Sequence, residues 1–245
     1  MIIQNHIENI LTPNGNMRSC VFRPVKSGSY ASIIFYSEIF QQTAPITRSA
    51  QILASHGFVV LVPEIFHELN PPGTVLAYDD AGKDKGNADK FAKTLEQHDN
   101  DTQAMLNFIA DQGYCNNKVG SMGVCIGGHL AFRAALNPEI HAGFCLYPTD
   151  IHSNTLACED SNDSLSRCGD IQGELCMLFG KQDPHVSREG RDRIRGAMLA
   201  AELDFSWHEV NAQHAFMRDE GERYDAVLAL QCYGMAIDLF QRTLR

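Results

Sequence analysis

Short apolar runs alternate along the chain with segments whose apolar residues recur at helical spacing. The clearest runs are Ala31–Tyr36, Phe58–Val62, Lys118–Val124, Ala142–Tyr147 and Gly173–Gly180. Phe58–Val62 is apolar at nearly every position, which is typical of a strand buried on both faces. The alternation predicts an α/β protein with a mostly parallel, twisted sheet and helices on both faces.

The remaining elements follow from the same periodicities. A turn at Pro13–Gly15 precedes an early strand, Met17–Arg23, and Asp204–Val210 is the last strand expected. Helical spacing predicts helices over residues 46–55, 99–112, 127–136, 187–202 and 224–243.

Two polar excursions, residues 66–98 and 148–170, interrupt the alternation. Polar segments of this length without strong periodicity are usually functional loops or lids, so we expect both to shape a pocket. The chain has no internal repeat, low-complexity tract or linker. We therefore expect residues 1–245 to form a single domain.

Charge and hydropathy narrow the range of partners. The formal net charge of −10 argues against binding to nucleic acid or to an anionic membrane. No apolar run reaches the ~18 residues that span a bilayer. The first residues lack the pattern of a signal peptide. We expect a cytoplasmic protein that acts on a small molecule, and the sequence does not indicate its oligomeric state.

The chain has eight cysteines, but their spacing is not that of a metal site or a secreted disulfide framework. Cys20, Cys145 and Cys176 lie in apolar runs, where cysteine behaves as a small buried hydrophobe. Cys158 and Cys168 share a polar loop and could pair under oxidation. No motif requires a metal ion or an organic cofactor.

The segment Gly123-x-Cys125-x-Gly127 has the spacing of a nucleophile elbow, with cysteine in place of serine. The nucleophile of such an elbow lies on a strained turn between a strand and a helix. Side chains two residues to either side would collide with the neighbouring strand and helix. Taken alone, this short match fits a passive glycine-rich turn equally well.

Two further residues favour the catalytic interpretation. Asp183 follows the strand Gly173–Gly180, and His214 follows the strand Asp204–Val210. Nucleophile, acid and histidine, each just beyond a strand, occur in the chain order of the α/β-hydrolase fold. His214 would accept the proton of Cys125, and Asp183 would orient the histidine.

A carbonyl attacked by the thiolate of Cys125 would give an acyl-enzyme, which water then releases. The oxyanion would be stabilised by two backbone N–H groups. One is that of Ile126, and the other is that of Ile39 in the loop after the Ala31–Tyr36 strand. Tyr147, at the end of a strand, would either line the site or lie at its rim.

The chain resembles the dienelactone hydrolase (carboxymethylenebutenolidase) family nearly from end to end. The matching segments are Ser37–Phe40, Pro71–Thr74, Gly123–His129, Gly180–His185 and His214–Met217 with Arg218. The resemblance implies a cysteine hydrolase of a small lactone or carboxylic ester, with the triad Cys125, Asp183 and His214.

The resemblance also implies roles for two charged residues. Glu38 would contact the resting thiol and help to generate the thiolate, and Arg218 would pair with a substrate carboxylate. The second pocket arginine of the family is absent, because the stretch that begins at residues 66–70 has no arginine or lysine before Lys83, and Glu68 takes its approximate place. Two alternatives stay open: a thioesterase or peptidase using the same site, and a non-catalytic ligand-binding protein.

Overall fold

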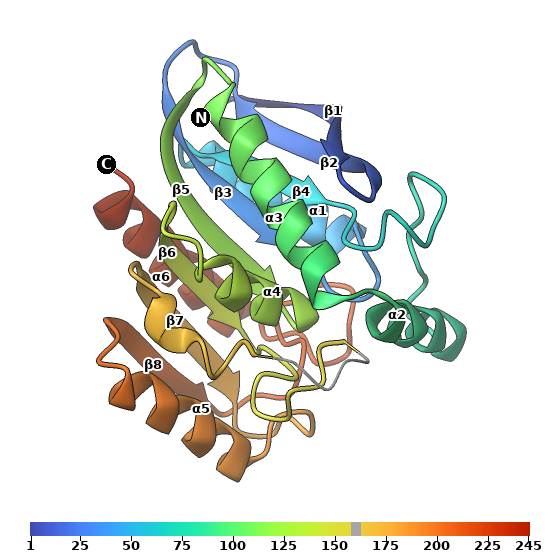
Figure 1. Cartoon of the computed structure of the whole chain (residues 1–245), viewed down its shortest axis with the longest axis vertical. Coiled ribbons are helices and arrows are strands. Elements are labelled where there is room, and N and C mark those ends of the chain that lie inside the picture. The colour runs from blue at the N-terminus through green and yellow to red at the C-terminus, as the bar shows by residue number, and fades with distance from the viewer. Residues whose placement is uncertain (158–162) are drawn as a thin grey trace.

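A computed structural model describes residues 1–157 and 163–245 and contains one eight-stranded sheet (Figure 1). The strands lie in the order β1-β2-β4-β3-β5-β6-β7-β8. Strand β2 pairs antiparallel with β1 and β4, and every other pairing is parallel. The strands are β1 Ile3–Thr12, β2 Gly15–Pro24, β3 Tyr30–Tyr36, β4 Val59–Pro63, β5 Cys115–Val124, β6 Ile140–Leu146, β7 Glu174–Gly180 and β8 Phe205–Val210.

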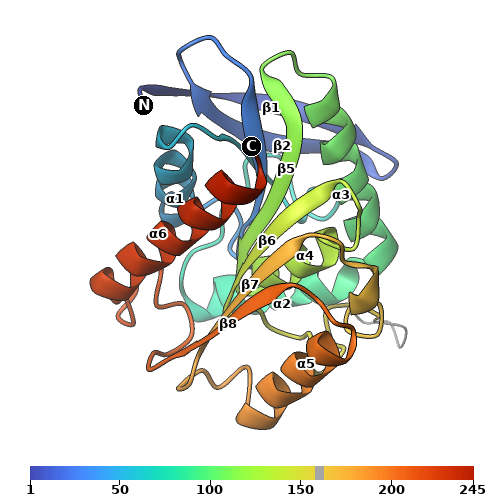
Figure 2. The ribbon, with the colours of Figure 1, turned by 90° about the vertical axis from the view of Figure 1, so that its left-hand side faces the viewer.

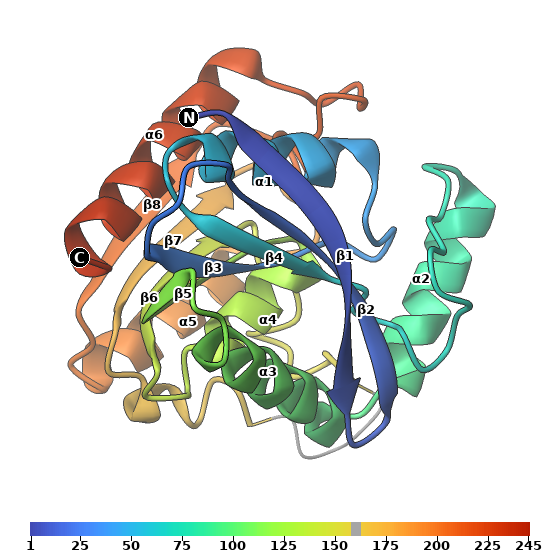
Figure 3. The same cartoon turned by 90° about the horizontal axis from the view of Figure 1, so that it is seen from above.

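Helices cover both faces of this sheet, as the apolar pattern predicts. Helices α1 and α6 lie on one face, and α3, α4 and α5 lie on the other (Figures 2 and 3). The α helices are α1 Ala44–Ser55, α2 Asp80–Ala92, α3 Leu95–Ala110, α4 Ile126–Ala134, α5 Arg188–Ala200 and α6 Ala226–Thr243, and a short 3₁₀ helix spans Cys168–Asp170.

Each face of the sheet carries its own hydrophobic core. Successive residues of the central strands alternate between the two cores, so that Ile34 packs on the side of α3 and α4 while Ile33 and Phe35 pack on the side of α1 and α6. All five residues of β4 are buried. This burial on both faces explains why the central strands are apolar almost throughout.

Strand β5 lies between β3 and β6, close to the centre of the sheet. Because β3 to β8 are parallel, the loops that follow them emerge at one end of the sheet. Open α/β sheets bind their ligands at that end. The topology therefore brings the loops after β3, β5, β6, β7 and β8 together.

Two elements differ from the sequence expectation. Strand β1 was not expected, because its alternating polar residues lie at a half-exposed edge and carry little apolar signal. The polar excursion 66–98 is also not all loop, since it contains α2 and the first turn of α3. Asp79 caps α2 by accepting a hydrogen bond from the N–H of Gly82. A capping box of Thr94 and Gln97 starts α3.

The cysteines that lie in apolar runs behave as expected. Cys20, Cys145 and Cys176 are free and buried. Cys168 is also free and buried, but Cys158 lies outside the described residues, so their pairing stays a prediction. None of the described helices combines the length and the apolar character that a membrane crossing would need.

A buried ion cluster fixes the loop after β4 to the start of α3. The ammonium group of Lys93 is fully buried and pairs with the carboxylates of Asp101 and Glu68. It also donates to the carbonyl oxygen of Ile65 at 2.9 Å. His67 Nε2 lies 3.0 Å from Asp101 Oδ1. Because Lys93 directly follows the last residue of α2, the cluster also holds that helix in place.

We predict that Lys93→Met destabilises the fold by about 3–5 kcal/mol, because it leaves two carboxylates buried without their cation. Urea unfolding measures the change. Lys26→Met, at an exposed position, is the matched control and should shift stability by no more than about 0.5 kcal/mol. Equal, small effects in the two variants would contradict a stabilising role for the cluster.

Candidate active site

Cys125 lies at the junction of β5 and α4 in a backbone conformation that L-residues rarely adopt. Its φ is +60° and its ψ is −125°. The N–H of Cys125 donates to the carbonyl oxygen of Leu146 at 3.1 Å. Its own carbonyl oxygen accepts from the N–H groups of Gly128 and Thr149, at 3.0 and 3.3 Å. These bonds hold the sharp turn that presents the thiol, at the N-terminus of α4.

The flanking glycines are required by close backbone contacts. A Cβ atom on Gly123 would lie 1.9 Å from the carbonyl oxygen of Gly127. A Cβ atom on Gly127 would lie 2.2 Å from the carbonyl oxygen of Tyr36 and 2.4 Å from that of Ser37. Neither position can accept a side chain without moving the backbone. The glycine spacing seen in the sequence therefore has the steric cause expected of an elbow.

Asp183 and His214 are brought together from the loops after β7 and β8. Oδ2 of Asp183 lies 2.7 Å from Nδ1 of His214, and both side chains are buried. Oδ1 of Asp183 accepts from the backbone N–H of His185 at 2.8 Å. The carboxylate is thus fixed by its own loop and holds the imidazole through one nitrogen.

His214 also interacts with Cys125. Burial alone would lower the pKa of His214, but the charge of Cys125 and hydrogen bonds to Asp183 and Cys125 raise it to about 10. Since Nδ1 faces Asp183, Nε2 is the nitrogen left for the thiol. The three residues therefore form one chain of polar contacts, Asp183 to His214 to Cys125.

Aromatic rings surround His214. Tyr147 packs edge-on against it, with ring centroids 5.1 Å apart, and His185 does so from another side at 4.5 Å. Tyr147 is buried and is absent from the residues that line the cavity described below. Its ring packs against that of His214, and a place within the site or at its rim, as the sequence suggests, stays a prediction.

Glu38 and Arg218 are paired with each other. Nη2 of Arg218 pairs with Oε2 of Glu38, and Nε donates to Oε1 at 3.1 Å. The hydroxyl of Tyr78 donates to Oε1 of Glu38 at 2.8 Å. The guanidinium carbon of Arg218 lies 4.1 Å from the ring centroid of Tyr78 and 5.1 Å from that of Phe40.

This pairing differs from the roles that the family resemblance implies. Among the described residues, no hydrogen bond joins Glu38 to Cys125. Arg218 faces the cavity, but its charge is compensated by Glu38. Partial burial would lower the pKa of Arg218, and the contact with Glu38 instead raises it above its ordinary value. Tyr78 hydrogen-bonds to Glu38 of this pair. It lies in the polar excursion 66–98, where no sequence pattern singled it out.

A cavity of about 200 Å³ opens above Cys125. It is lined by Ile39, Phe40, Lys83, Asn87, Lys90, Cys125, Ile126, Thr149, Asp150, His185, His214, Arg218 and Arg223. Both polar excursions contribute to this wall, through α2 and through the loop after β6.

The cavity has more cations than the sequence indicated. Lys90 pairs with Asp150 at 3.0 Å, and Lys83 pairs with Asp80 at 2.8 Å on the surface of α2. Arg223 forms no ion pair with any residue that the structure describes. The sequence analysis did not identify these cations, because no local pattern indicates which residues of α2 and of the loop before α6 face the cavity.

The two residues expected to supply the oxyanion donors, Ile126 and Ile39, both line the cavity. Ile126 is the first residue of α4, where an amide has no partner within its helix. Ile39 lies in the turn after β3, and its N–H makes no backbone hydrogen bond with a described residue. Both residues line the cavity beside Cys125. Their role as a pair of oxyanion donors stays a prediction.

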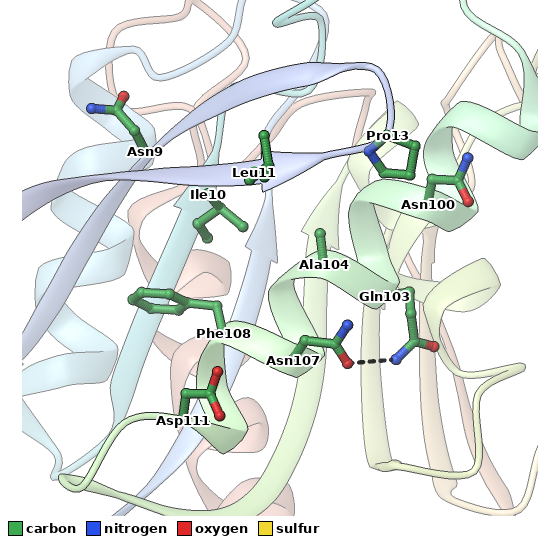
Figure 4. A pocket seen from close by; sticks show the side chains of 10 residues that line it. All are labelled: Asn9, Ile10, Leu11, Pro13, Asn100, Gln103, Ala104, Asn107, Phe108 and Asp111. Atoms are coloured by element: carbon green, nitrogen blue, oxygen red, sulfur yellow. Dashed lines mark hydrogen bonds between the residues drawn. The ribbon is translucent and has the colours of Figure 1, made fainter.

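A second hollow, of about 350 Å³, lies between β1 and α3 (Figure 4). Its polar wall is made largely of the carboxamides of Asn100, Gln103 and Asn107, and Gln103 donates to Asn107 at 3.1 Å. None of the described residues that line it is a cysteine, serine, threonine or histidine. The smaller cavity above Cys125 is therefore the candidate active site.

A parallel sheet with a cysteine elbow, followed in chain order by an acid and a histidine, defines a protein of the α/β-hydrolase superfamily. Comparison with known proteins identifies the family within this superfamily. The model of the dienelactone hydrolase family matches residues 17–244. The chain belongs to the dienelactone hydrolase family and is a hydrolase that acts on ester bonds.

Individual relatives cover nearly the whole chain. A yeast protein (Saccharomyces cerevisiae) named "Putative carboxymethylenebutenolidase" is 37% identical over 257 residues, which is 100% of this chain and 94% of the relative. The carboxymethylenebutenolidase of Pseudomonas putida is 26% identical over 200 residues, 80% of this chain and 79% of the relative. A structure titled "Putative Dienelactone Hydrolase", from Klebsiella pneumoniae, superposes with a TM-score of 0.84 at 20% identity and covers 99% of this chain and 100% of its own.

We predict that Cys125→Ala lowers the pKa of His214 below its value of about 10 in the unmodified protein. The substitution removes a negative charge that favours the imidazolium form, while the contact with Asp183 remains. Titration of the histidine ring by NMR measures the pKa in both proteins. An unchanged pKa would mean that the thiol does not interact with His214.

Proposed function

We propose that this protein hydrolyses a small lactone or carboxylic ester through an acyl-enzyme on Cys125. The observation that carries the proposal is the chain of contacts from Asp183 through His214 to Cys125 at the floor of a cavity. A cysteine nucleophile requires a neighbouring base that is itself held by a third group. This arrangement supplies both.

The first half of the reaction forms the thioester. The sulfur of Cys125 attacks the carbonyl carbon as a thiolate, and His214 holds the proton that the thiol has given up. The N–H groups of Ile126 and Ile39 donate to the oxyanion. As the tetrahedral intermediate collapses, imidazolium at His214 protonates the leaving alkoxide, and Asp183 stabilises that imidazolium.

The second half reverses these roles. His214 accepts a proton from water, which attacks the thioester carbonyl, and the same two amides stabilise the second oxyanion. Collapse breaks the C–S bond, releases the carboxylic acid and leaves Cys125 as a thiolate beside the imidazolium of His214. Each step needs only groups that line the cavity or contact His214, which supports the assignment of the triad.

The cavity favours a small substrate. A volume of about 200 Å³ suits a compact lactone or short ester better than a long peptide. A thioester of a short acid would fit the same site, so thioester hydrolysis is the second candidate activity. A purely ligand-binding role would leave the constrained backbone of Cys125 and the contacts of His214 without a purpose.

Recognition of a substrate carboxylate would use the cavity's cations. Arg218 is compensated by Glu38, which leaves Arg223 as the cation best placed to meet an anionic group. We place the reaction in the cytoplasm, since the spacing of the cysteines is not that of a secreted disulfide framework. We also propose that residues 1–245 act as one domain.

We predict that Cys125→Ala loses essentially all turnover, by several powers of ten, with the fold intact. Rates with dienelactone, nitrophenyl esters of short acids, simple lactones and acyl thioesters measure the loss. Cys115→Ala, at a buried cysteine outside the cavity, should retain the chemistry. Cys125→Ser should be slow but active, because a hydroxyl needs more help from a base than a thiol does.

Substantial turnover by Cys125→Ala would remove Cys125 as the nucleophile. A serine variant as fast as the unmodified protein would mean that His214 acts differently from the sequence of steps above. Absence of turnover with every substrate, together with an unreactive thiol, would favour the ligand-binding alternative.

We predict that Arg223→Met raises KM for an ester that carries a carboxylate by up to about fivefold, the range of one exposed ion pair. KM for a neutral ester of the same size should stay unchanged, and so should kcat for both. Arg188→Met, an exposed arginine on α5 away from the cavity, is the matched control. An equal rise for both esters would contradict a role in recognising charge.

A further inference from the structure

One wall of the cavity is polar, and the steps of the proposed reaction give it no role. It is formed by Asn87 and Lys90 of α2 and by Thr149 and Asp150 of the loop after β6. Small-molecule pockets are usually lined by apolar side chains, with only a few polar groups that fix the ligand. Four polar side chains on one wall of a small cavity therefore indicate a substrate that is itself polar.

We infer that this polar wall, Asn87, Lys90, Thr149 and Asp150, binds hydroxyl groups of the substrate, so that the enzyme prefers a sugar-like lactone, with hydroxyls on its ring carbons, to a plain lactone. The inference rests on the proposed function and names the substrate class of the same site. A hydroxyl both donates and accepts hydrogen bonds, so a site for several hydroxyls must offer donors and acceptors side by side. The polar wall offers both.

The polar wall begins directly beside the nucleophile. The N–H of Thr149 donates to the carbonyl oxygen of Cys125 at 3.3 Å, which fixes the loop after β6 against the elbow. The hydroxyl of Thr149 in turn donates to Oδ2 of Asp150 at 2.6 Å. A substrate whose carbonyl lies at Cys125 would therefore bring the substituents of its acyl part close to this loop.

Helix α2 contributes to the wall because it closely approaches the loop after β3. A Cβ atom on Gly86 would lie 2.8 Å from the carbonyl oxygen of Ile39 and 2.9 Å from its Cβ. Glycine at this position therefore lets the helix backbone lie against Ile39, which is expected to be an oxyanion donor. Asn87 and Lys90 follow Gly86 on the helix and line the cavity next to this contact.

The inner face of α2 is polar rather than apolar. A helix that covers a hydrophobic core normally buries an apolar stripe. The buried residues of α2 are instead Gly82, Gly86, Asp89 and Lys90. Figure 3 also shows this helix apart from those that cover the sheet. Packing of a hydrophobic core therefore does not explain the polar side chains that α2 presents to the cavity.

The polar wall retains donors and acceptors for a ligand. Nζ of Lys90 donates to Oδ1 of Asp150 at 3.0 Å, and the same oxygen accepts from the hydroxyl of Thr155 at 2.8 Å. An ammonium carries further N–H donors and a carboxylate carries further lone pairs, so each has capacity left. The carboxamide of Asn87 forms no hydrogen bond with any residue that the structure describes. Because Lys90 and Asp150 compensate each other's charge, the pair favours neutral hydroxyls over an anion.

Turnover of two lactones with the same ring size tests the preference. δ-Gluconolactone carries hydroxyl groups on its ring carbons, whereas δ-valerolactone carries none. The measure is kcat/KM divided by each lactone's own spontaneous rate of hydrolysis, which removes their difference in reactivity. We expect this value to be about tenfold or more higher for δ-gluconolactone, because the plain lactone leaves the polar groups of the wall without partners. Equal values, or a higher value for δ-valerolactone, would overturn the inference.

Asn87→Leu separates recognition of hydroxyls from a wall that is only hydrated. Leucine keeps the size of the side chain but cannot form its hydrogen bonds, so the preference for δ-gluconolactone should fall about fivefold. Lys90→Met should lower the preference by at least as much. Asn100→Leu is the matched control, at a partly exposed asparagine of α3 outside the cavity, and should keep the preference of the unmodified protein. A preference unchanged in one variant would remove that residue from the site, and a preference unchanged in both would overturn the assignment.

Binding of lactams separates this inference from the proposed function, because lactams resist hydrolysis. Calorimetry should show that the protein binds δ-gluconolactam more tightly than δ-valerolactam, and Asn87→Leu should reduce the difference. If the protein binds the hydroxylated lactam in this way but hydrolyses no lactone or ester, the hydroxyl site stands and the proposed function fails. If it hydrolyses both lactones but binds the two lactams equally well, the proposed function stands and the inference fails.

Discussion

The backbone conformation of Cys125 is the constraint on which the rest of the site depends. A φ of +60° in a residue with a side chain costs about 1–3 kcal/mol and persists only where the surroundings enforce it. Here Gly123 and Gly127 allow the strand and helix to approach closely enough. Leu146 at the end of β6 accepts from the N–H of Cys125, and Gly128 donates to the carbonyl oxygen of Cys125 across the turn. The stability of the folded sheet thus offsets the cost of this conformation and holds the thiol at the N-terminus of α4. There the free backbone amides and the helix dipole stabilise a negative charge on the sulfur. Other residues around the site share such conformations, notably Tyr147 and Ala215.

Around this thiol, the protein compensates nearly every charge. Arg218 is matched by Glu38, Lys90 by Asp150, and a thiolate at Cys125 by His214. Burial makes an unpaired charge costly, so these pairings fix side chains as well as lower the free energy of the folded state. A substrate therefore enters a cavity whose charged side chains are already paired with one another. The exception is Arg223, which lines the cavity and forms no ion pair with a described residue.

The sequence predicted those parts of the molecule that local patterns encode. The parallel sheet, its covering helices and the segment around Cys125 were expected from apolar periodicity and glycine spacing, and Asp183 and His214 were found because each follows a strand. Strand β1 and helix α2 were missed because one is a half-exposed edge and the other is rich in Asp, Lys and Gly.

The pairing of Glu38 with Arg218 joins residues 180 positions apart in the chain. Such a contact depends on how two loops meet in space, which no local pattern reports. The same applies to Tyr78, which secures that pair, and to the cations of α2 that face the cavity.

The most direct test of the central claim is to trap the acyl-enzyme. The protein is mixed with a slowly released nitrophenyl ester and quenched in acid, and its intact mass and peptides are then measured. The account predicts a mass increase equal to one acyl group, located on the peptide that contains Cys125 and removed by neutral hydroxylamine, as expected of a thioester. An acyl group on another residue, or turnover of the ester without any acyl group on Cys125, would contradict it.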